Sequence, residues 1–153
     1  MRVFLCSYNG FTLAIPIRFV SSIMLCKDKI KSITYFDEEN RSTFISLPFL
    51  FDCPSLDIRH GIILKDKNPG ENVSDNSIHE KTVLLSTEIE SETEIPDDMI
   101  YPIPRTLSAF YSLNIFNGIL FNLFSRSESA DNLILLLNPD FLIQYIKKEK
   151  QND

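Results

Sequence analysis

The side chains best suited to nucleophilic chemistry are a thiol and an imidazole close together in the sequence, Cys53 and His60, with Asp52 beside the thiol. A thiolate activated by an imidazole that a carboxylate orients is a common arrangement in cysteine hydrolases. The spacing matches no signature of such an enzyme, and His60 directly precedes an apolar run. The other histidine, His79, lies in a polar segment poorly suited to hold a general base. A Cys/His hydrolase is therefore the least favoured hypothesis, and we expect a chain that is not an enzyme.

Metal and cofactor sites are not expected either. The three cysteines, Cys6, Cys26 and Cys53, are widely separated, whereas structural zinc sites are built from closely spaced pairs. Scattered thiols in odd number are typical of a reducing compartment, so we expect no disulfides and a cytoplasmic location. The chain has only four glycines, too few for a Gly-rich phosphate loop. The sequence predicts no metal, no cofactor and no small-molecule substrate.

Charge and hydropathy exclude two further classes of partner. The formal net charge is −6, and nucleic-acid binding depends on clustered Lys and Arg. The one basic cluster, Lys147–Lys150, falls near the end of a predicted helix, where cations are favourable. No apolar run approaches the ~20 residues that span a bilayer, and the apolar start of the chain breaks off before any cleavage site. We therefore expect neither nucleic-acid binding nor membrane insertion.

The first half of the chain is predicted to consist of strands. Asn9-Gly10, between apolar runs at 3–8 and 11–16, is a preferred two-residue hairpin turn. The alternation at 11–16 indicates that one face of this strand is buried, whereas "IRFVSSIML" fits either a helical turn or a strand. A second hairpin joins Ile33–Phe36 to Thr43–Leu47 through a polar loop. Another strand, "IRHGIILK", leads into residues 65–80, which have almost no apolar side chains, so we expect a mobile loop there.

The second half is predicted to contain more strands and a terminal helix. Apolar and polar residues alternate from Thr82 to Ile95, which places Glu88, Glu90, Glu92 and Glu94 on one face. This acidic stripe is either a surface for a basic partner or, as we favour, a solvated edge strand. Strands follow at 115–121 and 133–137. Asn138 and Pro139 then suit the N-cap and first turn of a helix.

A glycine within the first of these two strands is a further candidate site. Asn117-Gly118 interrupts an otherwise apolar strand pattern, which indicates a bulge or a close backbone approach. A missing Cβ would allow a partner or the other barrel to approach the backbone.

The order of these segments resembles that of the CheW-like family, the adaptors of bacterial chemotaxis arrays. "VFLCSYNGFTLAIPIRFVSSI" is similar to the family's opening hairpin, and "FISLPFLF" to the end of its first half. "TVLLSTEIESETEIPDDMIYPIP" resembles the strand and turn that begin the second half. "NIFNGILF" and "NLILLLNPDFLI" are similar to its ending, with Gly118 at the family's glycine and Asn138 where an Asp is usual.

The resemblance implies an all-β fold of two small, intertwined SH3-like β-barrels with a short C-terminal helix. Residues 1–150 would then form a single CheW-like domain made of two fused halves. It also implies a non-catalytic adaptor that links a CheA-like histidine kinase to chemoreceptors. We expect protein contacts at the hairpin and beside the glycine; the candidate residues are Phe36, Arg41, Phe44, Asn117 and Gly118.

The sequence leaves a second function open. The family's Asn-Leu-Arg-Gly loop, which is tied to partner contact, is replaced here by "FDEENR", in which Arg41 is only near the position of the family's arginine. A structural or regulatory relative that kept the fold and lost the chemotaxis partners is therefore the alternative to an adaptor. Exposed apolar residues on edge strands would favour the adaptor, and a fully polar surface would favour the alternative.

Overall fold

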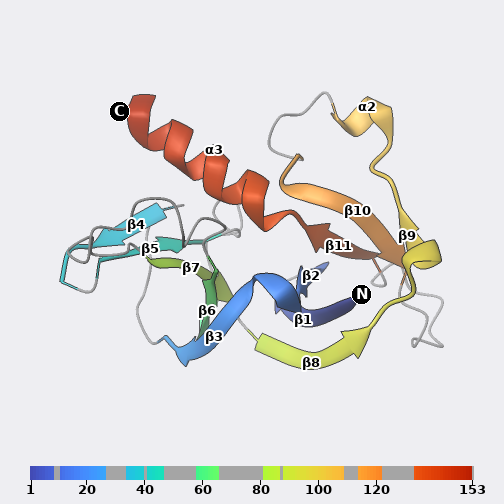
Figure 1. The fold of residues 1–153 in the computed structure, drawn as a ribbon, viewed down its shortest axis with the longest axis horizontal. Helices are drawn as coiled ribbons and strands as arrows, with labels where there is room; N and C mark the ends of the chain where they lie inside the picture. Colours follow the sequence, from blue (N-terminus) through green and yellow to red (C-terminus); the bar gives the residue numbers. More distant parts are fainter. Residues whose placement is uncertain are drawn as a thin grey trace. The chain divides into compact units, whose positions relative to one another are not determined.

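The computed structural model describes residues 1–8, 11–26, 34–39, 41–46, 58–65, 81–86, 88–108, 114–121 and 133–152. The chain forms two compact units. Unit 1 contains Met1–Arg18 and Glu88–Asp153, and unit 2 contains Phe19–Thr87. Each unit holds one sheet (Figure 1). The predicted all-β class with a C-terminal helix is confirmed, whereas the treatment of residues 1–150 as one domain stays a prediction.

Unit 1 has a six-stranded sheet in the order β8-β1-β2-β11-β10-β9. Its elements are β1 (Arg2–Tyr8), β2 (Phe11–Pro16), β8 (Glu88–Glu94), the 3-10 helix η2 (Asp97–Met99), β9 (Ile100–Tyr101), α2 (Arg105–Ser108), β10 (Phe116–Phe121), β11 (Leu133–Leu137) and α3 (Pro139–Asn152). Strands β2 and β11 run parallel, and the other pairs of this sheet are antiparallel.

Unit 2 has a five-stranded sheet in the order β3-β6-β7-β5-β4. Its strands are β3 (Val20–Leu25), β4 (Thr34–Asp37), β5 (Ser42–Ile45), β6 (His60–Leu64) and β7 (Lys81–Ser86). The 3-10 helix η1 (Ile17–Phe19) precedes β3, so the segment that fitted either a helical turn or a strand contains both. Strands β5 and β7 run parallel, and the other pairs of this sheet are antiparallel.

The predicted N-terminal hairpin is confirmed, but its second strand is more buried than the alternation indicated. Tyr8 pairs with Phe11, which leaves Asn9 and Gly10 as the connection between β1 and β2. The predicted buried face, with Leu13 and Ile15, is confirmed, and Ala14 and Pro16 on the other face are buried as well. The reason is position, because β2 lies between β1 and β11 and Ala14 packs into a cluster with Val3.

The alternation from Thr82 to Ile95 is not one edge strand, and that expectation is corrected. It divides into β7, which lies inside the sheet of unit 2, and β8, which lies at the edge of the sheet of unit 1. The run Val83–Ser86 is buried at every position, as is typical of a strand covered on both faces. The two-residue spacing of apolar side chains therefore continues from β7 into β8, although the two strands belong to different sheets.

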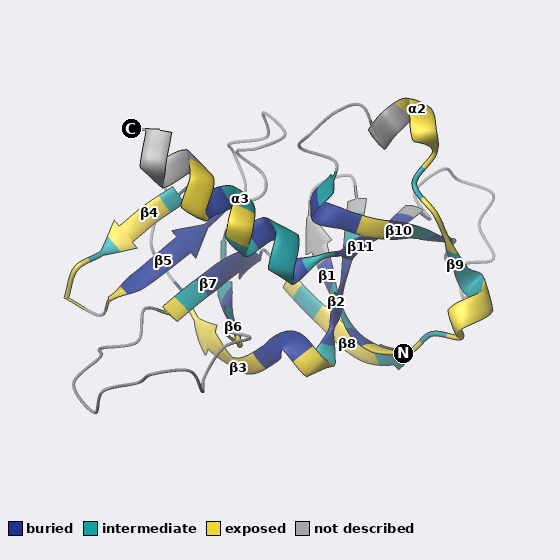
Figure 2. Cartoon of the chain, turned by 45° about the horizontal axis from the view of Figure 1, so that its top comes forward, coloured by how far each residue is buried: buried dark blue, intermediate teal, exposed yellow. Residues whose placement is uncertain are grey.

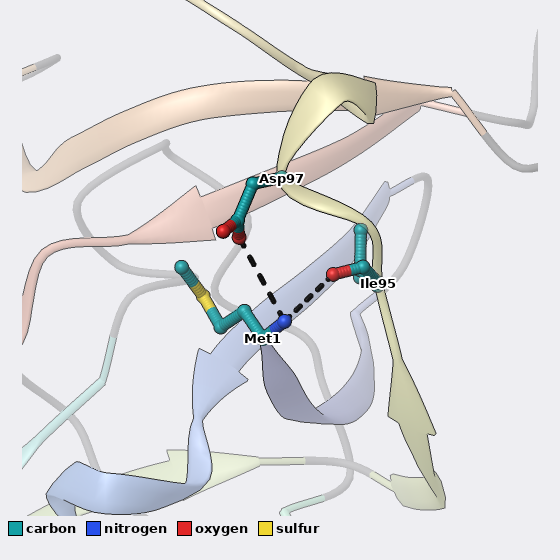
Figure 3. A network of polar contacts seen from close by, with 3 residues as sticks. All are labelled: Met1, Ile95 and Asp97. Carbon is teal, nitrogen blue, oxygen red and sulfur yellow. Dashed lines mark hydrogen bonds and ion pairs between the residues drawn. The ribbon is translucent and has the colours of Figure 1, made fainter.

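The N-terminus fixes the end of β8 (Figure 3). The Met1 ammonium group donates a hydrogen bond of 2.8 Å to the Ile95 carbonyl oxygen, and the Ile95 N–H donates one of 2.7 Å to the Met1 carbonyl oxygen. Asp97 at the start of η2 lies 3.7 Å from the ammonium nitrogen, in an exposed ion pair. The two backbone hydrogen bonds extend the β1–β8 ladder by one residue pair, Met1 and Ile95. They hold this end more than the ion pair does, because exposed ion pairs contribute little to stability.

The start of the C-terminal helix is as predicted. The Phe141 N–H donates a hydrogen bond of 3.2 Å to Asn138 Oδ1, and the Leu142 N–H donates one of 3.1 Å to the Asn138 carbonyl oxygen. Pro139 occupies the first helical position. Leu142 and Ile146, which lie four residues apart on one side of α3, are buried. The predicted mobile loop at 65–80 lies, apart from Lys65, outside the described residues.

We predict that Asn138→Ala lowers the free energy of unfolding by about 1 kcal/mol, because the helix loses the acceptor of its N-cap bond. Urea denaturation followed by circular dichroism measures the change. Asn138→Asp keeps an acceptor oxygen and is the matched control, which should stay near the wild-type value. Equal losses in both variants would show that the cap bond does not stabilise α3.

Candidate functional site

The β4–β5 hairpin, which the sequence predicts as a contact surface, forms with the expected pairing. Tyr35 lies opposite Phe44, and Phe36 lies opposite Thr43. The Glu39 N–H donates a hydrogen bond of 3.0 Å to Asp37 Oδ1, which closes the polar turn. Such an Asx turn is a common way for an aspartate to start a loop.

Arg41 lies at the end of this turn with a positive φ of 46°. Its side chain is exposed, and its carbonyl oxygen accepts a hydrogen bond of 3.0 Å from the Lys81 N–H at the start of β7. The backbone at Arg41 therefore ties the hairpin turn to the neighbouring strand, and the guanidinium group faces the surface.

The two phenylalanines of the hairpin lie on opposite faces of the sheet. Phe44 is 8% exposed and packs in a cluster with Cys26, Val83 and Leu85. Phe36, on the other strand, is 37% exposed. A directly opposite pair shares one face of a sheet, so Phe44 shares its face with Tyr35, not with Phe36. Phe44 is thus a core residue of unit 2, and its part in a protein contact stays a prediction.

Tyr35 is the hairpin residue that the sequence analysis missed. Its side chain is 54% exposed, and its ring centroid lies 6.2 Å from that of Phe44. The pairing of an exposed ring with a buried one gives the surface ring a rigid support. The sequence did contain a signal: Tyr35 and Phe36 are adjacent in a predicted strand. Adjacent residues in a strand point to opposite faces, so one of the two rings lies on the opposite face from the other.

A second group of exposed apolar residues lies on β3, at the opposite edge of the same sheet (Figure 2). Ile23, Met24 and Leu25 are each at least 37% exposed, and Leu25 reaches 74%. These residues were not predicted as candidates, because the sequence did not decide between a helix and a strand there. Both edge strands of unit 2 thus expose large apolar side chains, and its interior strand β7 and the neighbouring β5 are mostly buried.

Asn117 and Gly118 form the predicted bulge. The pairing of β10 with β11 shifts register between Phe116 and Gly118, and the Asn117 side chain is exposed. A Cβ added at Gly118 would lie 2.8 Å from Ile100 Cγ2 and 2.9 Å from the Tyr101 carbonyl oxygen. The space beside Gly118 is therefore filled by β9 of the same unit. The glycine permits packing within unit 1, and its part in a partner contact stays a prediction.

The acidic residues of β8 do not form a single stripe. Leu5 pairs with Ser91 and Cys6 with Ile89, so Glu90 is an extra residue in a β-bulge. Because directly opposite residues share a face, Glu92 and Glu94 lie on the face of Phe4, and Glu88 lies on the other. Arg2 forms an ion pair with Glu92. The expectation of four carboxylates on one face is wrong, whereas the predicted edge position of the strand is confirmed.

Of the residues in the hydrolase hypothesis, the structure describes only His60. His60 begins β6, and its Nδ1 atom is buried without a hydrogen-bond partner. Cys53, Asp52 and His79 lie outside the described residues. Cys6 and Cys26 are buried and are not joined in a disulfide. Within the described ranges, no group of three or more His, Cys, Asp or Glu side chains could hold a metal ion.

We predict that Phe44→Ala lowers the free energy of unfolding by about 3 kcal/mol, because it removes a ring from a packed core. Tyr35→Ala removes the exposed ring beside it and should cost less than half of that. Chemical denaturation of both variants decides the issue. A stable Phe44→Ala protein would place the ring outside the core.

We predict a separate loss for Gly118→Ala of about 1–3 kcal/mol, because the added methyl group overlaps Ile100 and the backbone of Tyr101. Asn117→Ala, at the exposed neighbouring position, is the control and should change stability by less than about 0.5 kcal/mol. Thermal unfolding is the measurement. A neutral Gly118→Ala substitution would contradict the close approach of β9.

Comparison with known proteins gives a match at the level of the fold. No family model matches the chain, and no curated protein sequence does. Among solved structures, the chain is similar to the crystal structure of the scaffolding protein TtCheW from Thermoanaerobacter tengcongensis. The TM-score is 0.57 at 14% sequence identity, over 90% of this chain and 83% of that chain. None of the described helices is long and apolar enough to cross a membrane. The chain therefore has a divergent CheW-like fold.

Proposed function

We propose that this chain is a non-catalytic adaptor that binds other proteins through the edges of its unit 2 sheet. The observation that carries the proposal is the concentration of exposed apolar side chains on β3 and β4. Five of the seven large apolar side chains that are exposed among the described residues lie there: Ile23, Met24, Leu25, Tyr35 and Phe36. They form two separate groups, because β3 and β4 are the opposite edge strands of this sheet. Contiguous groups of exposed apolar side chains are typical of interaction sites.

The β4 edge has the composition of a protein interface. Tyr35 and Phe36 supply aromatic side chains, which are enriched where binding energy concentrates. Asp37, Glu38 and Glu39 surround the end of the strand with charge, as the polar rim of an interface does. A surface that served only to keep the fold in solution would have no need for two exposed aromatic residues on an edge strand.

The partners that fit best are a CheA-like histidine kinase and a chemoreceptor. The support is the similarity in fold to a protein described as a scaffold, together with the exposed edge strands. In this proposal the chain acts in the cytoplasm without a cofactor, and its buried thiols stay reduced. The absence of the family's Asn-Leu-Arg-Gly loop is accommodated because the aromatic pair, and not Arg41, provides most of the contact energy.

We predict that Tyr35→Ala and Phe36→Ala together weaken binding to the kinase or to the receptor at least about thirtyfold, since a buried anchor contributes about 2 kcal/mol. The measurement is affinity for the purified kinase and for a receptor cytoplasmic fragment, both from the native bacterium. Glu38→Ala, at the charged rim, is the matched control and should change affinity less than about threefold.

Two results would contradict this proposal in different ways. If the folded double variant binds as tightly as the wild type, the β4 edge is not the contact surface. If the wild type binds neither kinase nor receptor, the chemotaxis partners are wrong, and the structural or regulatory relative becomes the better hypothesis.

A further inference from the structure

Strand β3 presents an open edge of the unit 2 sheet. Among the described strands it pairs with β6 alone, and it stands first in the sheet order. In an antiparallel pair, successive residues direct their N–H and C=O groups alternately toward the partner and away from it. Of the neighbours Ile23 and Met24, one therefore directs both backbone groups to the outer edge. The side chains from Ser21 to Leu25 are all exposed.

The charge at this edge is opposite to that of the whole chain. Every charged residue described in η1, β3, β6 and the residues that flank them is cationic: Arg18, Arg59 and Lys65. The Lys65 N–H donates to the Phe19 carbonyl oxygen at 2.7 Å, and the Cys26 N–H donates to the Arg59 carbonyl oxygen at 2.9 Å. Lys65 thus marks one end of β3 and Arg59 the other. The chain as a whole has a net charge of −6.

The other edge of the same sheet carries the reverse charge. At the end of β4, the described acidic residues are Asp37, Glu38 and Glu39, with Arg41 beyond them. The two edges therefore suit partners of different charge. The edge of β3 is apolar, is flanked by cations and has no second partner among the described strands. Its complement is an extended segment with apolar residues in its middle and acidic residues at its ends.

We propose that the outer edge of β3 binds such an acidic, extended segment of a partner protein, which adds to the sheet as a sixth strand. This inference rests on the adaptor function proposed above and specifies the chemistry of one partner. Main-chain hydrogen bonds to β3 supply affinity, and the side chains of Ile23, Met24 and Leu25 supply apolar contacts, as in other cases of strand addition. Lys65 and Arg59 fix the register of the segment through its acidic ends.

A second copy of this chain is a poorer occupant of the edge. Two β3 strands placed side by side in antiparallel register would bring the cations at their ends together, and like charges across a strand pair are destabilising. The same cations attract a segment with glutamates at its ends. The charge distribution therefore favours a foreign acidic strand over self-association.

The test uses the full chain and a synthetic peptide about nine residues long, the length of an ordinary strand. The peptide has capped ends, alternating valine and threonine in its middle and two glutamates at each end. Binding is measured by titration at low and high salt, and the contacted amides are located by NMR shifts and hydrogen exchange. One control peptide has lysines in place of the glutamates, and another keeps the glutamates around a glycine–serine middle.

The expected result is binding of the first peptide alone, with slowed amide exchange between Ser22 and Leu25. Lys65→Glu should weaken binding about threefold or more at low salt, because it reverses one charge of an exposed pair. Lys147→Glu on α3 changes the net charge equally and should leave binding unchanged. Raising the salt concentration should reduce the effect of Lys65→Glu.

Several results would overturn the inference. Equal binding of the glycine–serine peptide would make the edge a simple charge patch, and amide protection confined to β4 would place the contact elsewhere. Dimers of the full chain that Leu25→Glu dissociates would assign the edge to a second copy. If the kinase or receptor binds while the peptide does not, only the strand addition fails; if the peptide binds while both proteins do not, the adaptor partners fail and the β3 site stands.

Discussion

The parallel pairing of β2 with β11 is the constraint on which unit 1 depends. Ile134, Leu135 and Leu136 lie beside Thr12, Leu13 and Ala14, so a strand near the start of the chain is completed by one near its end. All of unit 2 is inserted between these strands. Unit 2 also contains one parallel pair, β5 with β7, and these two strands are closer together in the sequence. Parallel neighbours need long connections, and the loop-closure entropy of such pairs makes folding slow.

This pairing also determines which strands are left at the edges. In unit 1 the edge strand β8 is protected by exposed glutamates and by the bulge at Glu90, both of which discourage pairing with another sheet. In unit 2 the edge strand β3 also has a register shift, between Val20 and Ser22, but β3 and β4 both expose large apolar side chains. The binding function that we propose rests on these exposed apolar side chains.

Local features of the fold could be predicted from the sequence, because they depend on neighbouring residues. The Asn138 cap and the bulge before Gly118 each follow from the conformational preferences of one or two residues. The division of 82–95 into β7 and β8 could not be predicted, since Val83, Leu85 and Ile89 keep one parity across both strands and only the assignment to two sheets separates them.

The candidate site was predicted less well than the fold, for a related reason. The hairpin that carries Phe36 and Phe44 was found, but which of the two rings is buried depends on β7, whose Val83 lies beside Phe44. Gly118 was found as a close approach, but the sequence could not say that β9 makes the approach. Exposure is a property of the assembled sheet, so Tyr35 and the apolar residues of β3 emerge only from the structure.

The different constraints on buried and exposed positions explain how this fold can resemble that of the scaffolding protein at 14% sequence identity. Core positions such as Leu13, Leu84 and Leu136 need only an apolar side chain of suitable volume, and cores tolerate such exchanges. Exposed edge positions are under no such packing constraint, so they can change while the fold persists. The adaptor function that we propose assigns partner recognition to such positions on β3 and β4, where large apolar side chains are exposed.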